Sequence, residues 1–339
     1  MALRLGLQLG YWQARPHPGF VELAQEAEQL GYDSVWTAEA WGSDAFTPLA
    51  WIGAHTSRIK LGTAVVQLSA RTPTATAMHA LTLDHLTNGR VVLGLGVSGP
   101  HVVEGWYGQP FSKPLARTRE YVSIVRQVLR REAPVSSPGP HYPLPYTGPG
   151  AWGLGKPLKP ITHPLRADVP IFLGAEGPKN VALAAEIADG WLPLYYSPFR
   201  PEVYAESIAK RKPGFEIAVG VHVHVTDDVA AGLAPVKAML GFYIGGMGAK
   251  DRNFHKDLMA RMGYAAEAEK IQELFFRGDR AGAIAAVPDA FADEIALVGP
   301  RERIRERLQA FEATPVTTLL VFAADAAKLR QVAELVLDR

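Results

Sequence analysis

Residues 88–100 read NGRVVLGLGVSGP, and this stretch decides between two classes of α/β fold. From Gly94 it carries the spacing G-x-G-x-x-G, which occurs in dinucleotide-binding domains but is a weak signal alone. The full fingerprint has a strand before it, a helix opening at the third glycine and an acidic residue about 20 positions later. A strand is predicted at residues 91–93, but Pro100 follows the third glycine and Glu120 lies in a helical pattern. The context therefore argues against a Rossmann domain.

The same turn is close to the nucleophile elbow of serine hydrolases. That motif is G-x-S-x-G, and the run Gly96-Val97-Ser98-Gly99 supplies all of it except the last glycine, which is replaced by Pro100. We therefore expect Ser98 to offer a hydroxyl or a backbone N–H to a ligand rather than to act as a nucleophile.

Short apolar runs alternate with helical patterns on both sides of this turn. They predict eight strands, at residues 3–9, 34–37, 59–66, 91–95, 170–173, 191–194, 217–225 and 317–322. Helices are predicted between most of these strands, which is typical of an α/β fold of the (β/α)8 TIM-barrel class rather than of two Rossmann halves. We expect one domain over residues 1–339 with two insertions between strands. One is a proline- and glycine-rich loop near 133–169, a candidate cover for a site, and the other is helical, near 237–290.

The composition argues against several functional classes. The chain has 35 Lys and Arg against 34 Asp and Glu, a net charge of +1, and it has no basic run. This composition argues against nucleic acid as a partner. The chain has no cysteine, which excludes disulfides and thiolate chemistry. We find no signal peptide and expect no apolar run long enough to span a bilayer. The prediction is a cytoplasmic protein that acts on a small molecule, without membrane or nucleic-acid partners.

In a barrel of this class, chemistry lies at the carboxyl ends of the strands. The side chains predicted at those ends are Gln8, Gly10, Tyr11, Glu39, Trp41, Thr63–Gln67, Gly96–Gly99, Gly174–Asn180, Tyr195, Tyr196, His222 and His224. Tyr11, Trp41, Tyr195 and His222 are the predicted substrate pocket. Aromatic residues could equally belong to the core, since rings of this size are often buried there.

The turn after the fifth predicted strand, residues 174–180, has the form of an anion site. Pro178 suits the first helical position, which makes Gly177 the cap. The N–H groups of Lys179 and Asn180 would then point outward with the positive end of the helix dipole. Taken alone, the turn is better explained as an ordinary capped helix start. Next to the glycine turn after strand four, however, a phosphate shared by the two turns is the better prediction.

Two further groups carry possible chemistry. His222 and His224 share one face of a strand, as a metal-binding pair would. The neighbouring strand ends offer no further ligand except Glu176, so we predict no metal site and place the histidines in the barrel interior or the pocket. Glu39 ends the second strand, where a carboxylate could act as a general acid or base, or could pair with a nearby arginine.

These residues carry a resemblance to a known family. The sequence is similar to the luciferase-like monooxygenase superfamily, in its branch of oxidoreductases that depend on the deazaflavin coenzyme F420. The matching pieces are DSVWTAEAW (33–41), IKLGTAVVQLSARTP (59–73), NGRVVLGLGVSGP (88–100), KPLARTREYV (113–122), GPKNVALAAEIADGW (177–191) and EIALVGPRERI (294–304). They run in order through nearly the whole chain.

The resemblance implies a barrel mouth that holds a deazaflavin, or alternatively FMN. In such proteins the ring lies against a bulge after strand three, and the bond between Ala64 and Val65 is expected to be cis. The phosphate is expected at the turns after strands four and five. The cofactor-binding residues implied in this way are Thr63, Ala64, Val65, Gly96, Val97, Ser98, Gly99, Glu176, Gly177, Pro178, Lys179 and Asn180.

One departure from the family pattern bears on the reaction. Sugar-phosphate dehydrogenases of this group place a histidine after the strand-two acid and a glutamate in the strand-four turn, where this chain has Ala40 and Gly99. We therefore predict a homodimeric enzyme that transfers hydride to a small organic substrate, acting as a reductase. Glu39 and His222 are the candidate proton donors.

Three alternatives remain open at this point. The chain could be an FMN-dependent monooxygenase of the same superfamily. It could be a metal-dependent barrel hydrolase built on His222 and His224. It could also be a flavin-binding protein without catalytic activity, in which case no room for a substrate would be left beside the cofactor.

Overall fold

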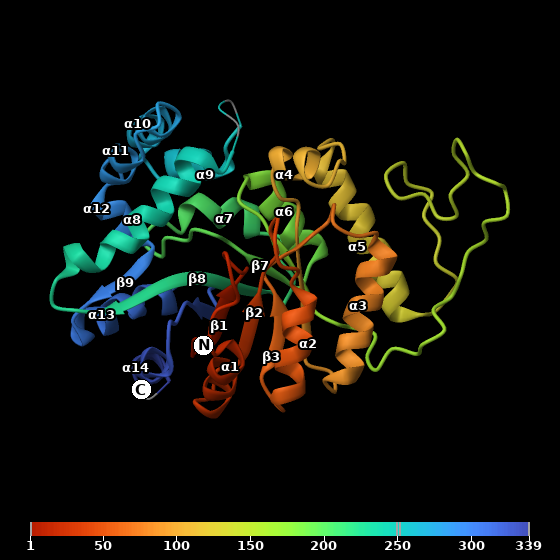
Figure 1. The fold of residues 1–339 in the computed structure, drawn as a ribbon, viewed down its shortest axis with the longest axis horizontal. Coiled ribbons are helices and arrows are strands. Elements are labelled where there is room, and N and C mark those ends of the chain that lie inside the picture. Colours follow the sequence, from red (N-terminus) through yellow and green to blue (C-terminus); the bar gives the residue numbers. More distant parts are fainter. Residues whose placement is uncertain (1, 249, 251, 338–339) are drawn as a thin grey trace.

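The computed structural model describes residues 2–248, 250 and 252–337 of the chain. Eight parallel strands form a closed barrel, which confirms the predicted fold class (Figure 1). The barrel strands are β1 Arg4–Gly10, β2 Ser34–Thr37, β3 Lys60–Thr63, β5 Val91–Gly96, β6 Ile171–Gly174, β7 Gly190–Leu192, β8 Glu216–Val225 and β10 Thr318–Val321. They pair in this order, and β10 closes the barrel by pairing with both β8 and β1.

Helices on the outside of the barrel cover the strands. They are α1 Phe20–Gln29, α2 Phe46–His55, α3 Pro73–Leu86, α5 Pro114–Arg130, α6 Pro178–Ile187, α7 Glu202–Ile208, α13 Arg301–Glu312 and α14 Ala326–Val336. The inside of the barrel is filled by a separate apolar cluster: Trp36, Val92, Phe172, Leu192, Ala218 and Leu320. Strands such as β5 are therefore buried on both faces, which is why they appear in the sequence as continuous apolar runs.

The third predicted strand is interrupted. The sequence indicated one strand over 59–66, whereas β3 ends at Thr63 and a short strand, β4 Val66–Gln67, continues beside β5. The bond between Ala64 and Val65 at the interruption is cis, as the resemblance implied.

The expectation that no helix follows the glycine turn was wrong. A short helix, α4 Pro100–Gly105, opens directly after Gly99, which is its N-cap. Proline is favoured at the first position of a helix because its missing N–H would be unpaired there in any case. The turn therefore has two of the three Rossmann companions, and the closed barrel around it still excludes that fold.

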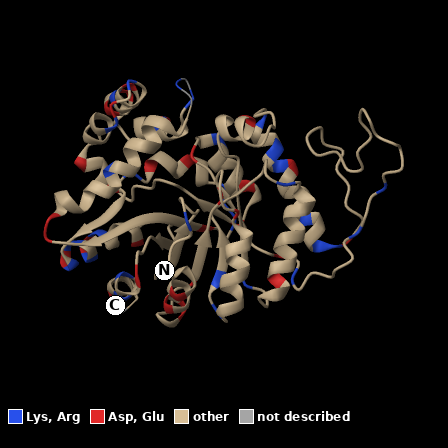
Figure 2. Cartoon of the chain, viewed as in Figure 1, with Lys and Arg blue, Asp and Glu red and all other residues tan. Residues whose placement is uncertain are grey.

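The loop insertion lies between α5 and β6. It is held by two isolated bridges, Val135 with Leu158 and Ser137 with Leu144, and it extends away from the barrel beside α3 and α5 (Figure 1). None of residues 133–169 lines the cavity described below, so this loop does not cover the site as we had expected. Residues 133–155 also carry no charged side chain, while Lys, Arg, Asp and Glu are mixed over the outer helices (Figure 2).

The helical insertion is wider than predicted. It comprises α8 Val229–Gly246, α9 Phe254–Arg261, α10 Ala265–Phe276, α11 Arg280–Ala285 and α12 Asp289–Glu294. It ends in an unpredicted strand, β9 Ala296–Gly299, which pairs with the far end of β8. Contrary to expectation, α8 is long and apolar enough to cross a membrane by length and composition alone. It packs against α10, α11 and α12, and a core helix of a globular protein passes the same test.

Candidate active site

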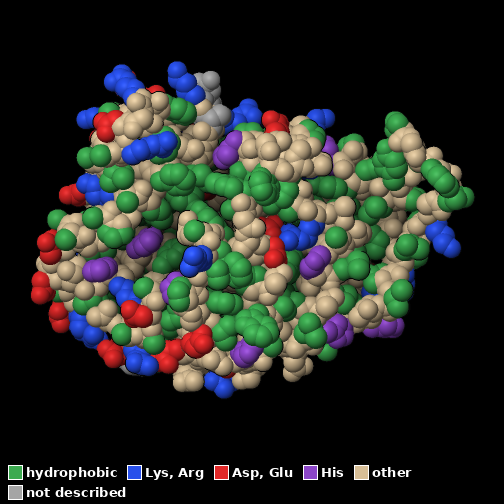
Figure 3. Space-filling model, viewed as in Figure 1, with side chains coloured by type: hydrophobic (Ala, Val, Ile, Leu, Met, Phe, Trp, Pro, Cys, Tyr) green, Lys and Arg blue, Asp and Glu red, His purple; other side chains and the backbone are tan. Residues whose placement is uncertain are grey.

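A cavity of about 790 Å³ lies at the carboxyl ends of the barrel strands. On the face seen in Figure 3, hydrophobic side chains gather around the hollow at the centre of the molecule. Every predicted catalytic, pocket and cofactor-binding residue lines this cavity except Thr63. Thr63 is fully buried, and its hydroxyl bonds both the N–H and the carbonyl of Gly94 at 2.8 Å. It joins β3 to β5 and does not line the cavity.

The first two glycines of the G-x-G-x-x-G motif allow β5 to pack closely against the end of β3. A β-carbon on Gly94 would lie 1.8 Å from the carbonyl oxygen of Thr63, and one on Gly96 would lie 2.5 Å from the side chain of Val65. Gly174 on β6 also lies close under Val65. Residues two apart share one face of a strand, so the G-x-G spacing clears the space that the bulge at Ala64–Val65 occupies. The motif is thus explained by barrel packing.

The turn before α6 leaves open space at the cavity. A β-carbon on Gly177, the N-cap of α6, would meet nothing within 4 Å. The N–H of Asn180 donates to the carbonyl of Gly177 at 2.9 Å, so the prediction that it is free for an anion was wrong. Of the two predicted donors, the Lys179 N–H is the one without an acceptor in the described part of the chain. Helix starts often turn tightly in this way, which uses up one N–H.

Glu39 is held by its own surroundings. Its carboxylate accepts the N–H of Gln67 at 2.7 Å and pairs with the Arg71 guanidinium at 2.9 Å, and its side chain is almost completely buried. Among the interpretations of Glu39, the geometry favours the structural acid paired to an arginine. A carboxylate occupied in this way is poorly placed to deliver a proton.

His222 lines the cavity in a neutral form. Its ring stacks on Phe322 with centroids 5.0 Å apart, and its Nε2 lies 3.4 Å from the sulfur of Met239. Burial, with a smaller contribution from the Lys328 charge, lowers the pKa of His222 to about 4. His224 lies further along β8, exposed and away from the cavity lining, so the two imidazoles do not face one ligand.

Of the other aromatic residues predicted at the strand ends, Tyr196 lies elsewhere, because it is buried in the core and stacked on Tyr204. Tyr11, Trp41 and Tyr195 line the cavity, as predicted.

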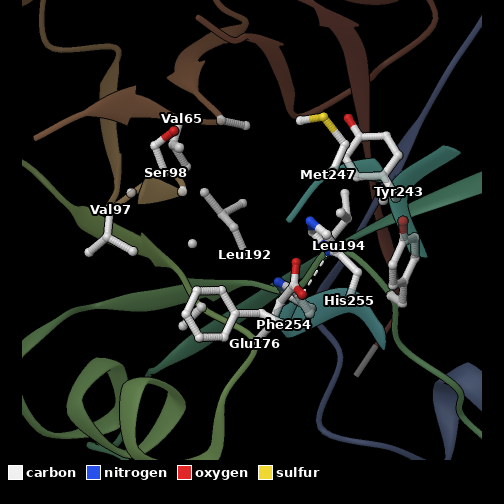
Figure 4. Close-up of a pocket in the computed structure, with 18 of the residues that line it drawn as sticks. Val65, Val97, Ser98, Glu176, Leu192, Leu194, Tyr243, Met247, Phe254 and His255 are labelled. Carbon is white, nitrogen blue, oxygen red and sulfur yellow. Dashed lines mark ion pairs between the residues drawn. The ribbon is translucent and has the colours of Figure 1, made fainter. Parts of the chain in front are cut away.

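One wall of the cavity was not anticipated. Helices α8 and α9 and the segment between them contribute Tyr243, Met247, Phe254 and His255, which face the strand-end residues across the cavity (Figure 4). The imidazole Nδ1 of His255 lies 2.8 Å from Oε2 of Glu176. Glu176, predicted to bind the cofactor, therefore directs its carboxylate toward α9. Aromatic pairs on both sides of the glycine-rich run at 245–248 were the available signal in the sequence.

Several buried polar atoms of this cavity have no hydrogen-bond partner among the described residues. They are Gln8 Oε1, Gln67 Oε1 and Tyr195 Oη, whereas Glu176 Oε2 and His255 Nδ1 face each other at 2.8 Å. Leaving such an atom unpaired costs about 1–3 kcal/mol, so their concentration in one cavity points to a ligand.

A family model described as luciferase-like monooxygenase matches residues 8–318. The chain belongs to this family. The luciferase-like chain is 57% identical, over 98% of its length and 99% of the relative's, to a Mycobacterium tuberculosis protein provisionally named a coenzyme F420-dependent oxidoreductase. It is 27% identical to the 5,10-methylenetetrahydromethanopterin reductase of Archaeoglobus fulgidus, over 87% and 86% of the two chains.

A solved structure shares the architecture. The coenzyme F420-dependent tetrahydromethanopterin reductase of Methanopyrus kandleri superposes with a TM-score of 0.81, at 21% identity, over 100% of this chain and 99% of that one. This structural match shows the shared fold. The family model and the sequence relatives confirm the family and its F420-dependent branch, and this luciferase-like protein is an oxidoreductase.

Proposed function

We propose that the protein binds coenzyme F420 and transfers hydride between it and a small organic substrate, acting as a reductase. The observation that carries the proposal is the 57% identity to the Mycobacterium tuberculosis protein, which is provisionally named a coenzyme F420-dependent oxidoreductase. The match covers nearly the whole of both chains. A deazaflavin supplies hydride without the oxygen chemistry of flavins, and the protein supplies placement and electrostatics.

The strand-end wall fits such a cofactor. The Ala64–Val65 bulge gives a flat apolar support, since Val65 is seated over Gly96 and Gly174. The unpartnered amide oxygens of Gln8 and Gln67 are acceptors suited to the N–H groups of a flavin-like ring. The open space at Gly177, beside the Lys179 N–H and the start of α6, suits a phosphate. These residues would hold the cofactor.

The proposed direction, reduction of the substrate, is supported by the residues at two positions near Glu39. Ala40 and Gly99 both line the cavity at the positions where sugar-phosphate dehydrogenases carry their acid–base pair. Glu39 is paired with Arg71, and the lowered pKa of His222 keeps its ring neutral at pH 7. Neither of these two predicted residues is therefore favoured as the proton donor. The proposal includes cytoplasmic location and a homodimer, as expected from sequence.

The test is an absorbance assay under anaerobic conditions. Reduced F420 is mixed with the protein and a panel of enones, ketones, imines and nitroaromatics. We expect reoxidation of the cofactor with at least one acceptor. Oxygen consumption with reduced FMN, together with no reaction of F420, would make the protein an FMN-dependent monooxygenase instead.

A further inference from the structure

Three polar side chains of the cavity lie where the turn before α6 meets α9. They are Tyr195, whose hydroxyl has no partner among the described residues, and the paired Glu176 and His255, and we call these three residues the polar notch. Each comes from a different element: Glu176 precedes α6, Tyr195 follows β7 and His255 belongs to α9. The notch is therefore formed only where the helical insertion meets the barrel.

Packing fixes the three groups in place. The ring centroids of Tyr195 and His255 are 5.8 Å apart in an edge-on contact, and Tyr243 stands edge-on to both. His255 and Glu176 are 2.8 Å apart, and Arg261 of α9 donates to the backbone carbonyl of Glu176 at 2.8 Å. In Figure 4 the Glu176–His255 pair lies among Leu194, Tyr243, Met247 and Phe254. The notch is thus a small polar point in an apolar chamber.

The hydrogen-bonding capacity of the notch limits what it can bind. Burial, and then the charge of Glu176, raises the pKa of the Tyr195 hydroxyl well above its usual value, so this group remains a proton donor. Glu176 Oε2 faces His255 Nδ1 and retains a lone pair that can accept a hydrogen bond from a ligand. The Glu176 carboxylate disfavours a negatively charged substrate group in direct contact with it. A neutral oxygen that accepts one hydrogen bond, and can donate one, satisfies the notch.

We propose that the polar notch binds the single oxygen function of a neutral, otherwise apolar substrate, a ketone or the corresponding alcohol. This names the substrate class of the function proposed above and rests on that function for the redox step alone. Tyr195 would donate to the oxygen in either state, and Glu176 would accept from the hydroxyl of the alcohol. Tyr195 and Glu176 are then specificity-determining residues.

The structure offers a matched pair of tyrosines for a test. Tyr195 and Tyr204 are both buried, but the Tyr204 hydroxyl already donates to the backbone carbonyl of Tyr195 at 2.8 Å and lies outside the cavity lining. Tyr195→Phe removes a hydroxyl that has no partner in the protein, whereas Tyr204→Phe removes one that has. The first should alter ligand binding without lowering the melting temperature, and the second should do the reverse.

The experiment compares two probes of the same shape, cyclohexanone and methylenecyclohexane, which differ by an oxygen in place of a CH2 group. Binding is measured by ligand-observed NMR on the protein loaded with oxidised F420, in which no hydride can be transferred to the ketone. Wild-type protein and Tyr204→Phe should prefer cyclohexanone by about tenfold or more, and Tyr195→Phe should lose most of this preference. Glu176→Gln serves as a second variant, which should retain cyclohexanone binding but weaken that of cyclohexanol, measured with reduced F420, to which the alcohol cannot transfer hydride.

Equal binding of the two probes to the wild-type protein would overturn the proposal, as would an unchanged preference in Tyr195→Phe. In either case the notch would hold no more than a buried water. The titrations are repeated without cofactor, so that the two proposals can fail separately. A preference for cyclohexanone that survives when F420 does not bind would support the notch and contradict the proposed function.

Discussion

The two walls of the cavity are built in different ways. The wall at the strand ends consists of backbone, glycines and the Ala64–Val65 bulge, and its buried charge, Glu39, is fully paired. The wall from α8 and α9 consists mainly of aromatic and sulfur-containing side chains, and its His255 pairs with Glu176 of the barrel. We infer that the barrel provides a rigid binding surface for a cofactor, while the helical insertion provides the surface that selects a substrate.

The loop insertion, residues 133–169, does not contribute to the site in the way that the helical insertion does. It is also long and rich in apolar residues, yet Trp152 and Ile161 are 90% and 95% exposed and none of its residues reaches the cavity. An insertion between barrel strands therefore shapes the site only when it emerges over the carboxyl ends, as α8 and α9 do.

The largest effect is expected at the strand-end wall. Arg71→Ala should leave the Glu39 carboxylate buried without its counter-ion and lower the free energy of unfolding by about 3 kcal/mol. Urea denaturation measures this difference. The double variant Arg71→Ala with Glu39→Gln should recover much of the loss, because no buried charge remains. If the single variant is as stable as the wild type, the Glu39–Arg71 pair does not stabilise the strand-end wall.

A somewhat smaller effect is expected from Gly177→Val, in cofactor binding rather than in stability. Its side chain would project into open space at the cavity, so the affinity for F420 should fall about 30-fold, corresponding to about 2 kcal/mol, with little change in melting temperature. Gly31→Val is the control, because Gly31 has a φ of +85° and lies far from the cavity in a helix-stop position. It should lower the melting temperature and leave affinity unchanged. Parallel losses in both variants would refute a phosphate seat at α6.

His222 gives an effect of about 1 kcal/mol that depends on pH. Its pKa of about 4 in the folded state lies below the ordinary value of 6.5, so protonation favours the unfolded chain as the pH falls from about 6.5 toward 4. The stability contributed by the neutral ring is present above pH 6.5 and declines below it. Between pH 7.5 and 5.5, the wild type should lose about 1 kcal/mol more stability than His222→Gln. Identical losses would mean that the ring is not buried in neutral form.

The smallest effect is expected from the loop insertion. Replacing residues 146–154 by a short Gly-Ser linker should change the affinity for F420 by less than about twofold, since these residues lie outside the cavity. The same titration used for Gly177→Val measures it. A large loss of affinity would show that the loop reaches the site, and the contrast between the two insertions would have to be abandoned.

The sequence predicted the strand-end wall better than the opposite wall, for a physical reason. Strand ends converge by the rules of barrel closure, so residues such as Glu176 and Tyr195 could be assigned to one mouth from their positions alone. His255 is brought to the same cavity by the packing of α9 on α10 and α8, which no local pattern reveals. Thr63 and the Asn180 N–H were misassigned because their partners, Gly94 and Gly177, are set by backbone geometry.

The central claim is that the strand-end wall is a seat for a deazaflavin, and its most direct test is equilibrium binding of two cofactors to the same protein preparation. Quenching of tryptophan fluorescence, or equilibrium dialysis, gives dissociation constants for F420 and for FMN. We expect the protein to bind F420 with a micromolar or lower dissociation constant and to bind FMN more weakly. Tighter binding of FMN than of F420 would contradict the claim.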